Sequence, residues 1–255
     1  MELGPLPRKE RFGRPTTLPA IWGLAALLVA IVLVVTRCGY GAVLIAADGF
    51  DSVLRNGWGS TDAGGSYTLI GDPSDFDVAD GVGTILLRDP STLRAAYLSD
   101  VSSRDFGATL RVTTDRAPVG GRHFIYLCLR RTHQAEYVAK MSIGEGGAVF
   151  LQASSLVRSG TEQEVALGPE IQLTHIAYEP GIWMNLEAQI SGVDATRIRI
   201  RAWPSGSPQP GWQVSVVDAL PALQVPGTVG IRARVGTAVT ELPLVVRVDD
   251  FRVGQ

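Results

Sequence analysis

The fold is decided by the stretch Gly181–Asp218, GIWMNLEAQISGVDATRIRIRAWPSGSPQPGWQVSVVD. In its first part, apolar and polar side chains alternate from Ile182 to Ser191. A repeat of two residues is the period of a β-strand that buries one face, whereas a helix repeats about every 3.6 residues. The stretch therefore begins with a half-buried strand.

A second strand follows the turn at 192–194, and its apolar residues alternate with arginines. Pairing Ile190 with Ile198 joins the apolar faces of the two strands and sets Glu187 opposite Arg201. We expect this cross-strand charge pair to be exposed and to contribute only a few tenths of a kcal/mol. It supports the register of the hairpin but does not drive folding.

A third strand is predicted after the loop 204–211, which is too rich in proline and glycine to continue the second one. Trp212, Val214 and Val216 restart the alternation of apolar and polar side chains. We therefore expect Trp212 to be buried with the two valines.

The composition of the chain narrows its class. Its 255 residues carry a net charge of -2 and a pI near 5.9, which gives no basic patch for nucleic acid. The 29 glycines and 15 prolines fit short strands joined by turns. The two cysteines, Cys38 and Cys128, lie in different settings, so we expect no disulfide between them.

The first 37 residues differ from the rest. Residues 1–17 form a basic tail, and residues 18–37 contain the uncharged run Leu18–Val35, about as long as a helix that crosses a membrane. A cleaved secretory signal has a shorter apolar core and a small-residue cleavage site, and it remains the alternative. We predict an uncleaved transmembrane helix that acts as a signal anchor.

The charges around this run set the expected topology. Basic residues before an apolar segment favour the cytoplasmic side. The chain is therefore predicted to be a single-pass protein of the cell membrane, with the domain at residues 38–255 outside the cell.

That domain shows roughly a dozen short strand patterns separated by Gly, Asp and Pro, and no helical period. No change in composition divides it. We predict an all-β fold, a single sandwich of two antiparallel sheets. His123 shares a face with Ile125 and Leu127, so we expect it in the core.

Several short motifs along this domain resemble those of the concanavalin A-like lectin and glucanase jelly rolls. They are Asn56-Gly57-Trp58-Gly59, Asp62–Tyr67, Trp183, Ala202-Trp203, Gly211–Val214, Pro226–Gly230 and Val248-Asp249-Asp250-Phe251. The pattern is most similar to the non-catalytic, LamG-like modules of surface proteins from actinobacteria and their phages. The resemblance implies two curved sheets, a concave face that often holds glycan, and frequently a structural calcium.

Enzymatic residues are not evident in the sequence. A retaining glycosidase needs two carboxylates about 5–5.5 Å apart, and acids at alternate positions of one strand would supply them. No strand pattern carries such a run: Glu136 is isolated, and Glu162 and Glu164 lie where a loop enters a short strand. We therefore expect no catalytic residues and no enzyme activity.

Four acids near the ends of the domain are the candidate metal ligands, because the first and last strands lie side by side in the resembled fold. They are Asp48, Asp51, Asp249 and Asp250. Calcium prefers several hard oxygen ligands. The alternative is that these acids cap strand ends or pair with Arg247 or Arg252. Strand alternation would point Asp249 and Asp250 to opposite faces, so at most one of them would be a side-chain ligand.

Two sets of arginine and aromatic side chains each share a strand face and are the candidate ligand-binding residues. They are Tyr126 with Arg130, and Trp203 with Arg199 and Arg201. Such faces suit hydroxyl-rich or acidic glycans. A solvated outer face explains the arginines equally well.

The sequence thus predicts a membrane-anchored, extracellular carbohydrate-binding (lectin-like) or adhesion module without catalytic activity. Its partner would be a glycan or a surface protein, with no role for nucleic acid. The alternative is a structural component of a cell surface or virion that assembles through protein–protein contacts.

Overall fold

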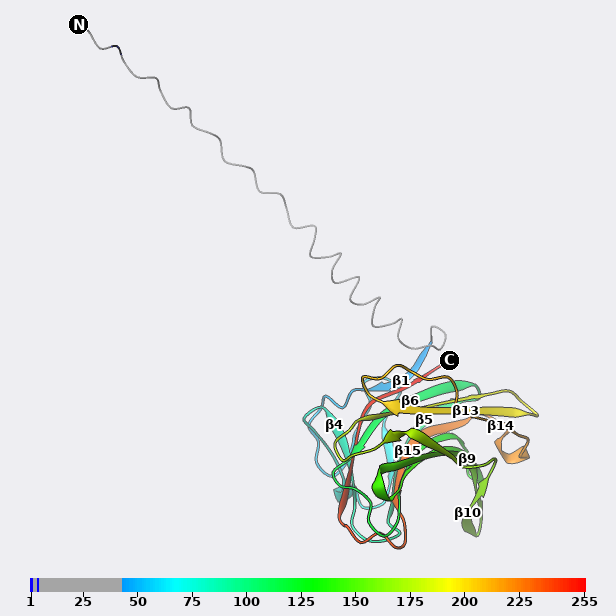
Figure 1. Ribbon diagram of the computed structural model, residues 1–255. Helices are drawn as coiled ribbons and strands as arrows, with labels where there is room; N and C mark the ends of the chain where they lie inside the picture. The colour runs from blue at the N-terminus through cyan, green and yellow to red at the C-terminus, as the bar shows by residue number, and fades with distance from the viewer. Residues whose placement is uncertain (2–3, 5–42) are drawn as a thin grey trace. The chain divides into compact units, whose positions relative to one another are not determined.

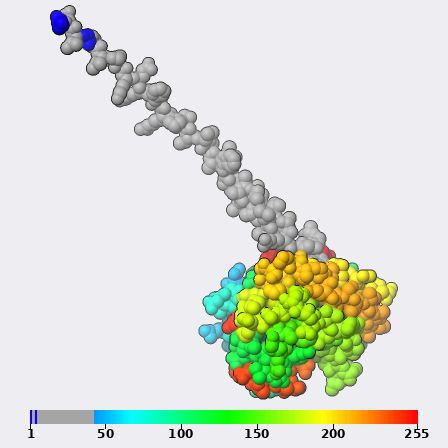
Figure 2. Space-filling model, viewed as in Figure 1, coloured from blue at the N-terminus to red at the C-terminus, as the bar shows by residue number. Residues whose placement is uncertain are grey.

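The computed structural model describes Met1, Gly4 and residues 43–255 of the chain. The apolar run Leu18–Val35 lies outside the described residues, so the transmembrane helix stays a prediction. Within the described part, no helix has both the length and the apolar character needed to cross a membrane. The strands belong to one compact unit, Tyr40–Gln255, which is continuous in the space-filling view (Figure 2).

The first sheet has the strand order β14-β13-β12-β6-β16-β4-β3, and β1 also pairs with β16. Every pairing within it is antiparallel. Its strands are β1 (Leu44–Asp48), β3 (Phe76–Ala79), β4 (Val82–Leu87), β6 (Phe106–Thr114), β12 (Met184–Ser191), β13 (Thr196–Pro204), β14 (Val214–Asp218) and β16 (Leu244–Gly254).

The second sheet has the order β10-β9-β8-β7-β15-β5-β2, with β11 paired to β9, and is likewise antiparallel. Its strands are β2 (Tyr67–Ile70), β5 (Leu93–Ser103), β7 (His123–Arg131), β8 (Ala135–Ile143), β9 (Ala148–Ser159), β10 (Thr161–Ala166), β11 (Ile171–Ala177) and β15 (Gly227–Val235). Among the described residues the only helices are three short 3₁₀ turns: η1 (Pro73–Asp75), η2 (Glu145–Gly147) and η3 (Pro221–Leu223). Figure 1 shows the two layers. The predicted all-β, two-sheet antiparallel sandwich is confirmed.

The main core lies between the sheets and consists of the apolar residues at alternate strand positions, such as Leu127, Met141, Leu186 and Val248. A second, smaller apolar cluster lies on the outer face of the second sheet. It consists of Ala95, Tyr97, Tyr126, Cys128, Val138 and Leu156. Cys128 is a free, buried thiol. A sheet that buries apolar side chains on its outer face as well must be partly covered there.

The predicted hairpin is confirmed: β12 pairs with β13 so that Ile190 faces Ile198 and Glu187 faces Arg201. The expectation that this charge pair is exposed is wrong, since Glu187 is only 2% exposed. Arg201 donates two hydrogen bonds to Glu187, at 2.9 and 2.8 Å. The loop after β13 covers the pair, because Gln209 donates to Glu187 at 2.7 Å and the carbonyl of Pro210 accepts from Arg201 at 3.1 Å.

The prediction that Trp212 is buried in the core is wrong, because β14 begins only at Val214. The ring lies on the arginine face of the hairpin instead. The guanidinium carbons of Arg199 and Arg201 lie 4.9 and 4.3 Å from its centroid. The proline- and glycine-rich loop therefore ends two residues later than the alternation suggests.

The first and last strands pair as predicted, with Asp48 opposite Phe251. The expectation that Asp249 and Asp250 point to opposite faces is wrong. Asp250 has φ +50° and the β16–β6 register shifts between Asp249 and Arg252, so a bulge interrupts the alternation. Both carboxylates contact the same guanidinium, that of Arg111, at 2.8 and 3.4 Å.

The counter-charge for these acids is therefore mainly Arg111, not Arg247; Arg252 contributes a longer contact of 3.9 Å to Asp250. Asp48 accepts the backbone N–H of Phe50 at 2.8 Å. Within residues 43–255, no three acids, histidines or cysteines gather closely enough to hold a metal ion. The side chains do not form a calcium cage by themselves, and calcium at Asp48, Asp51, Asp249 and Asp250 stays a prediction.

Two measurements test what neutralises these acids, the ion pair with Arg111 or a bound calcium ion. The first is replacement of Arg111 by alanine. We expect the Arg111→Ala variant to lose about 1 kcal/mol of unfolding free energy, because both aspartates lose their partner near the surface. Urea unfolding measures this. A thermal melt with calcium or with chelator tests the metal: a Tm that rises with calcium and falls with chelator supports it. An unchanged Tm removes calcium, and an unchanged stability of Arg111→Ala contradicts the ion-pair account.

His123 is fully buried, as predicted, and neither ring nitrogen has a hydrogen-bond partner among the described residues. Burial lowers its pKa from the usual 6.5 to about 4. The unfolded chain therefore binds a proton between these pH values that the folded chain does not. The stability contributed by the neutral ring is complete above pH 6.5 and is lost as the pH falls toward 4, by up to about 3 kcal/mol.

Substitution of His123 by phenylalanine should remove this pH dependence. We expect the wild type to lose about 2 kcal/mol more unfolding free energy than His123→Phe on going from about pH 7 to pH 4.5. Urea denaturation of both proteins at the two pH values gives the difference, in which contributions from other groups cancel. Equal losses would show that His123 is not titrating from a buried neutral state.

Candidate active site

The outer face of the second sheet presents the side chains that alternate with the core residues. On β8 these are Glu136, Val138, Lys140 and Ser142. The register places Lys140 between Tyr126 on β7 and Gln152 on β9. The face therefore combines the small apolar cluster with acids and bases from at least four strands.

One ion pair shows that this face is concave. Arg232 on β15 and Glu162 on β10 are separated by three intervening strands. In a flat sheet their backbones would be about 19 Å apart, beyond the combined reach of the two side chains. Arg232 Nη2 nevertheless lies 2.5 Å from Glu162 Oε1. The sheet must therefore curve inward, which Figure 1 shows as the arch from β15 through β9 to β10.

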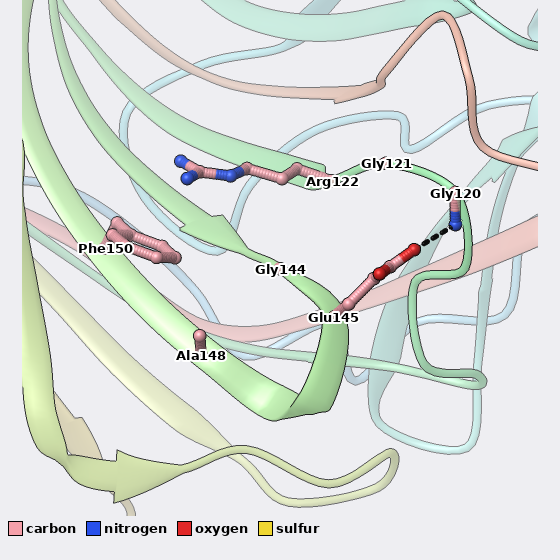
Figure 3. A pocket seen from close by; sticks show the side chains of 7 residues that line it. All are labelled: Gly120, Gly121, Arg122, Gly144, Glu145, Ala148 and Phe150. Carbon is pink, nitrogen blue, oxygen red and sulfur yellow. Dashed lines mark hydrogen bonds between the residues drawn. The ribbon is translucent and has the colours of Figure 1, made fainter.

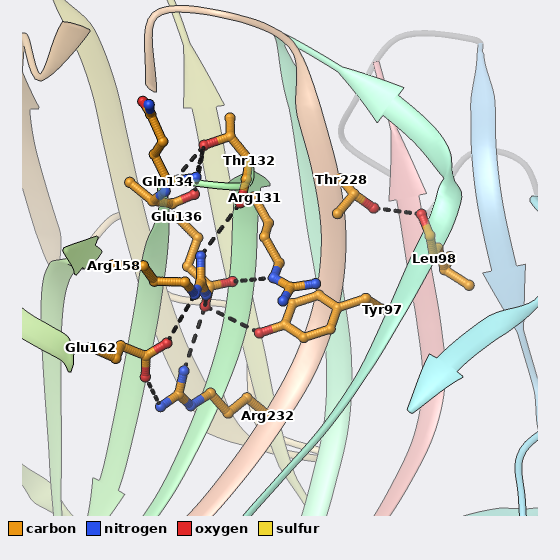
Figure 4. Close-up of polar contacts among 11 residues, drawn as sticks. Tyr97, Leu98, Arg131, Thr132, Gln134, Glu136, Arg158, Glu162, Thr228 and Arg232 are labelled. Atoms are coloured by element: carbon orange, nitrogen blue, oxygen red, sulfur yellow. Dashed lines mark hydrogen bonds and ion pairs between the residues drawn. The ribbon is translucent and has the colours of Figure 1, made fainter. Parts of the chain in front are cut away.

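Glu136 lies at the centre of this network and is fully buried (Figure 4). Its Oε1 accepts hydrogen bonds from Arg158, from the hydroxyl of Tyr97 at 3.1 Å and from Arg232 at 3.5 Å. Its Oε2 accepts no hydrogen bond within the described part of the chain and lies 3.9 Å from Arg131 Nε. One carboxylate oxygen is thus crowded with donors while the other is left free.

The same two arginines also hold Glu162. Arg158 Nε is 3.2 Å from Glu162 Oε2, and Arg232 Nη2 is 2.5 Å from Oε1. Glu136 and Glu162 are therefore bridged by a shared pair of guanidinium groups. Their exposure differs, because the side chain of Glu162 is 32% exposed and that of Glu136 is covered.

The surroundings drive the pKa values of these two acids in opposite directions. Burial raises the pKa of Glu136 above its usual value, despite the three nearby arginines. Partial burial also acts to raise the pKa of Glu162, but the hydrogen bond and charge of Arg232, with help from Arg158, outweigh it and lower that pKa. Pairs of carboxylates separated in this way are typical of sites that need one acid and one base.

Local sequence explains how Tyr97 on β5 reaches Glu136 on β8 across β15 and β7. A side chain at Gly230 would place its Cβ 2.5 Å from the ring of Tyr97, so only glycine leaves room there. The guanidinium carbon of Arg131 lies 3.9 Å from the centroid of the same ring. Tyr97 is thus held between a glycine and an arginine, with its hydroxyl aimed at Glu136.

Arg130 does not lie on this face, which corrects the prediction that it shares a surface with Tyr126. Arg130 has φ +47°, and the β15–β7 register shifts next to it, so a bulge turns its side chain inward and brings Arg131 outward instead. Arg130 is fully buried. It donates hydrogen bonds to the carbonyls of Arg104, Gly192 and Leu223, to the hydroxyl of Thr196 and to Asp105.

The other predicted ligand-binding residues are divided between the two sheets. Tyr126 is on the outer face of the second sheet and is 2% exposed. Arg199, Arg201 and Trp203 are on β13 of the first sheet, where Arg201 lies beside the rings of Trp203 and Trp212. The structure does not bring the two sets together. Glycan binding by either set stays a prediction.

A shallow pocket of about 430 Å³ opens where β7 begins and β8 ends (Figure 3). Its walls are Arg122, Glu145, Ala148, Phe150 and three glycines. Phe150 is in register with Ser142, whose hydroxyl accepts a hydrogen bond from Arg122 at 3.4 Å. The pocket therefore lies at one end of the outer face that also carries Glu136.

Sequence reasoning missed Glu136 and Glu162 as a pair because it looked for acids at alternate positions of one strand. The two acids come from β8 and β10, with β9 between them. The alternation of Glu136 with buried Ala135 and Tyr137 does place it on an outer face. Nothing local in the sequence states that the sheet curves enough to bring Glu162 to it.

Comparison with known proteins identifies the fold. No known family model matches the chain, and no curated protein sequence matches it. A solved structure from a study of endo-acting O-glycanases, expressed by human gut microbiota to initiate mucin breakdown, has a TM-score of 0.56 at 10% identity. The match covers 83% of this chain and 98% of that one. A β-1,3-glucanase from Mycobacterium marinum has a TM-score of 0.50 at 13% identity, over 82% and 98% of the two chains.

An alginate lyase structure is also similar, at a TM-score of 0.49, 10% identity, and 72% and 84% coverage. At these identities the comparisons show the fold, a sandwich shared with glycosyl hydrolases and consistent with the concanavalin A-like jelly roll. The prediction of a non-catalytic lectin, adhesion or assembly module is overturned by them, because the O-glycanase and glucanase structures are those of carbohydrate-processing enzymes.

Proposed function

We propose that the domain is a carbohydrate-processing enzyme that hydrolyses glycosidic bonds on the concave face of the second sheet. The observation that carries the proposal is the pair Glu136 and Glu162, which share two arginines and whose pKa values are shifted in opposite directions. The fold supports it, because it is shared with glycosyl hydrolases.

Each acid has a role that suits its surroundings. Glu136, whose pKa is raised by burial, would act as the acid and donate a proton to the glycosidic oxygen as the sugar leaves. Glu162, whose lowered pKa keeps it ionised, would attack the anomeric carbon or remove a proton from the attacking water. In either route one water molecule is added across the broken bond. The free Oε2 of Glu136 is the oxygen available to carry the proton.

Substrate must reach a carboxyl that its neighbours now cover. The weakest of the contacts around Glu136 is that of Arg131, at 3.9 Å, and the side chain of Arg131 is 26% exposed. Displacement of Arg131 would open Oε2 to the sugar while Arg158 and Arg232 still hold Oε1. Arg131 is thus a cover over the acid in this proposal and not a reacting group.

Elimination, the reaction of a lyase, is less well supported by this face. It needs a base that removes a proton from carbon, often a tyrosine in its ionised form. Burial raises the pKa values of Tyr97 and Tyr126, so both phenols hold their protons firmly near neutral pH. Two carboxylates of opposite pKa shift suit hydrolysis better.

The test is turnover by the full-length protein on a panel of polysaccharides, followed as new reducing ends. We expect Glu136→Gln and Glu162→Gln to lower kcat by about 10²–10⁴-fold, because each removes a proton-transfer or nucleophilic group. Thermal melts of both variants separate loss of chemistry from loss of folding.

Two further variants serve as controls. Glu187→Gln alters a buried Arg–Glu pair on the other sheet and should leave turnover unchanged. Arg131→Ala should retain turnover because it uncovers the acid. The proposal fails if no polysaccharide is cleaved by the wild type, or if Glu162→Gln is as active as the wild type.

A further inference from the structure

The pocket at the end of the concave face contains one stacked arginine. The guanidinium carbon of Arg122 lies 4.0 Å from the ring centroid of Phe150, and its Nη1 donates to Glu170 at 2.8 Å. In Figure 3 the side chain of Arg122 extends toward the ring of Phe150. Stacking fixes the plane of the guanidinium, so the donors of its remaining edge stay aimed in one direction.

The face of the Phe150 ring that the guanidinium covers is consequently not available as a platform for a sugar. The pocket offers polar edges instead: the free donors of Arg122 on one side and the carboxylate of Glu145 on the other. Glu145 Oε1 accepts the backbone N–H of Gly120 at 2.5 Å, which fixes its orientation. Planar donors and acceptors of this kind match neighbouring hydroxyl groups of a sugar, each of which both donates and accepts.

The pocket carries no excess positive charge. Arg122 is the one cation among the residues that line it, and Glu145 is the one acid among them. Arg122 is also paired with Glu170, whose side chain is 30% exposed. A carboxylate or sulfate of an acidic sugar would therefore meet a cation that is already neutralised and a second carboxylate beside it.

We infer that this pocket is a subsite for an uncharged sugar unit, so that the substrate is a neutral glycan and not a polyuronate or sulfated chain. The inference rests on the proposed function, because it takes the concave face as the substrate surface. Its volume of about 430 Å³ falls within the range of small-ligand pockets, about 300–1,000 Å³. The three glycines and Ala148 in its walls have no side chain large enough to fill the pocket.

An array of immobilised oligosaccharides with neutral, uronic acid and sulfated members tests this directly on the full-length protein. We use the Glu162→Gln background so that bound chains are not cleaved. The expected result is binding to neutral members only, weakened roughly tenfold or more by Arg122→Ala and by Glu145→Ala. Arg122→Lys should also weaken binding, since lysine keeps the charge but loses the planar edge.

Arg199→Ala is the matched control, because Arg199 also stacks on an aromatic ring but on the first sheet. It should leave binding unchanged, and thermal melts verify that every variant is folded. The inference is overturned if acidic members bind as well as neutral ones or better, if no member binds, or if Arg122→Ala binds as well as its parent.

The experiment also separates this inference from the proposed function. Binding to neutral glycans that depends on Arg122, without turnover by the wild-type protein, would remove the enzyme proposal and leave the subsite. Turnover that depends on Glu162 but not on Arg122 would support the enzyme proposal and remove the subsite.

Discussion

The inward curve of the second sheet is the constraint on which the polar network of the concave face depends. The curve brings Arg232 within 2.5 Å of Glu162, although their strands lie four positions apart in the sheet. The hydrogen bond from Tyr97 to Glu136 needs the same curve across three positions. A flatter sheet would break both contacts and expose the small apolar cluster around Tyr126 and Cys128. The curve of the sheet is therefore needed both for the polar network and for burial of the apolar cluster on the outer face.

The first sheet shows what the same residue types do without this constraint. Arg201 and Glu187 lie on neighbouring strands, directly opposite one another, and need no curvature to meet. Their pair is covered by a loop and serves the hairpin. On the second sheet the arginines reach across strands and hold two acids with different pKa values. The sheet geometry, more than the residue types, separates a structural ion pair from a candidate catalytic pair.

Burial makes this network costly to disturb. Removing one partner of a buried ion pair typically costs about 3–5 kcal/mol, because the remaining charge is left without compensation. Glu136 is fully covered, and burial raises its pKa despite the three nearby arginines. A carboxyl group whose pKa is raised by its surroundings is better suited to donate a proton than one in water.

Much of the fold was predictable from the sequence, since alternation depends only on neighbouring residues. The β12–β13 register and the buried His123 follow from it, whereas the pairing of β1 with β16 is expected from the resembled fold. The errors have a common cause, which is that bulges and loops interrupt alternation without a periodic signal. Arg130, Asp250 and Trp212 each lie at such a point. The Glu136–Glu162 pair was missed for a different reason, because it depends on the curvature of a whole sheet.

A crystal structure of the Glu162→Gln variant with a bound neutral oligosaccharide tests the central claim most directly. The account predicts sugar density along the outer face of the second sheet, from the pocket at Arg122 to the amide of residue 162, with Arg131 displaced from Glu136. Sugar bound instead at Trp203 on the first sheet, with the Glu136 network undisturbed, would contradict it.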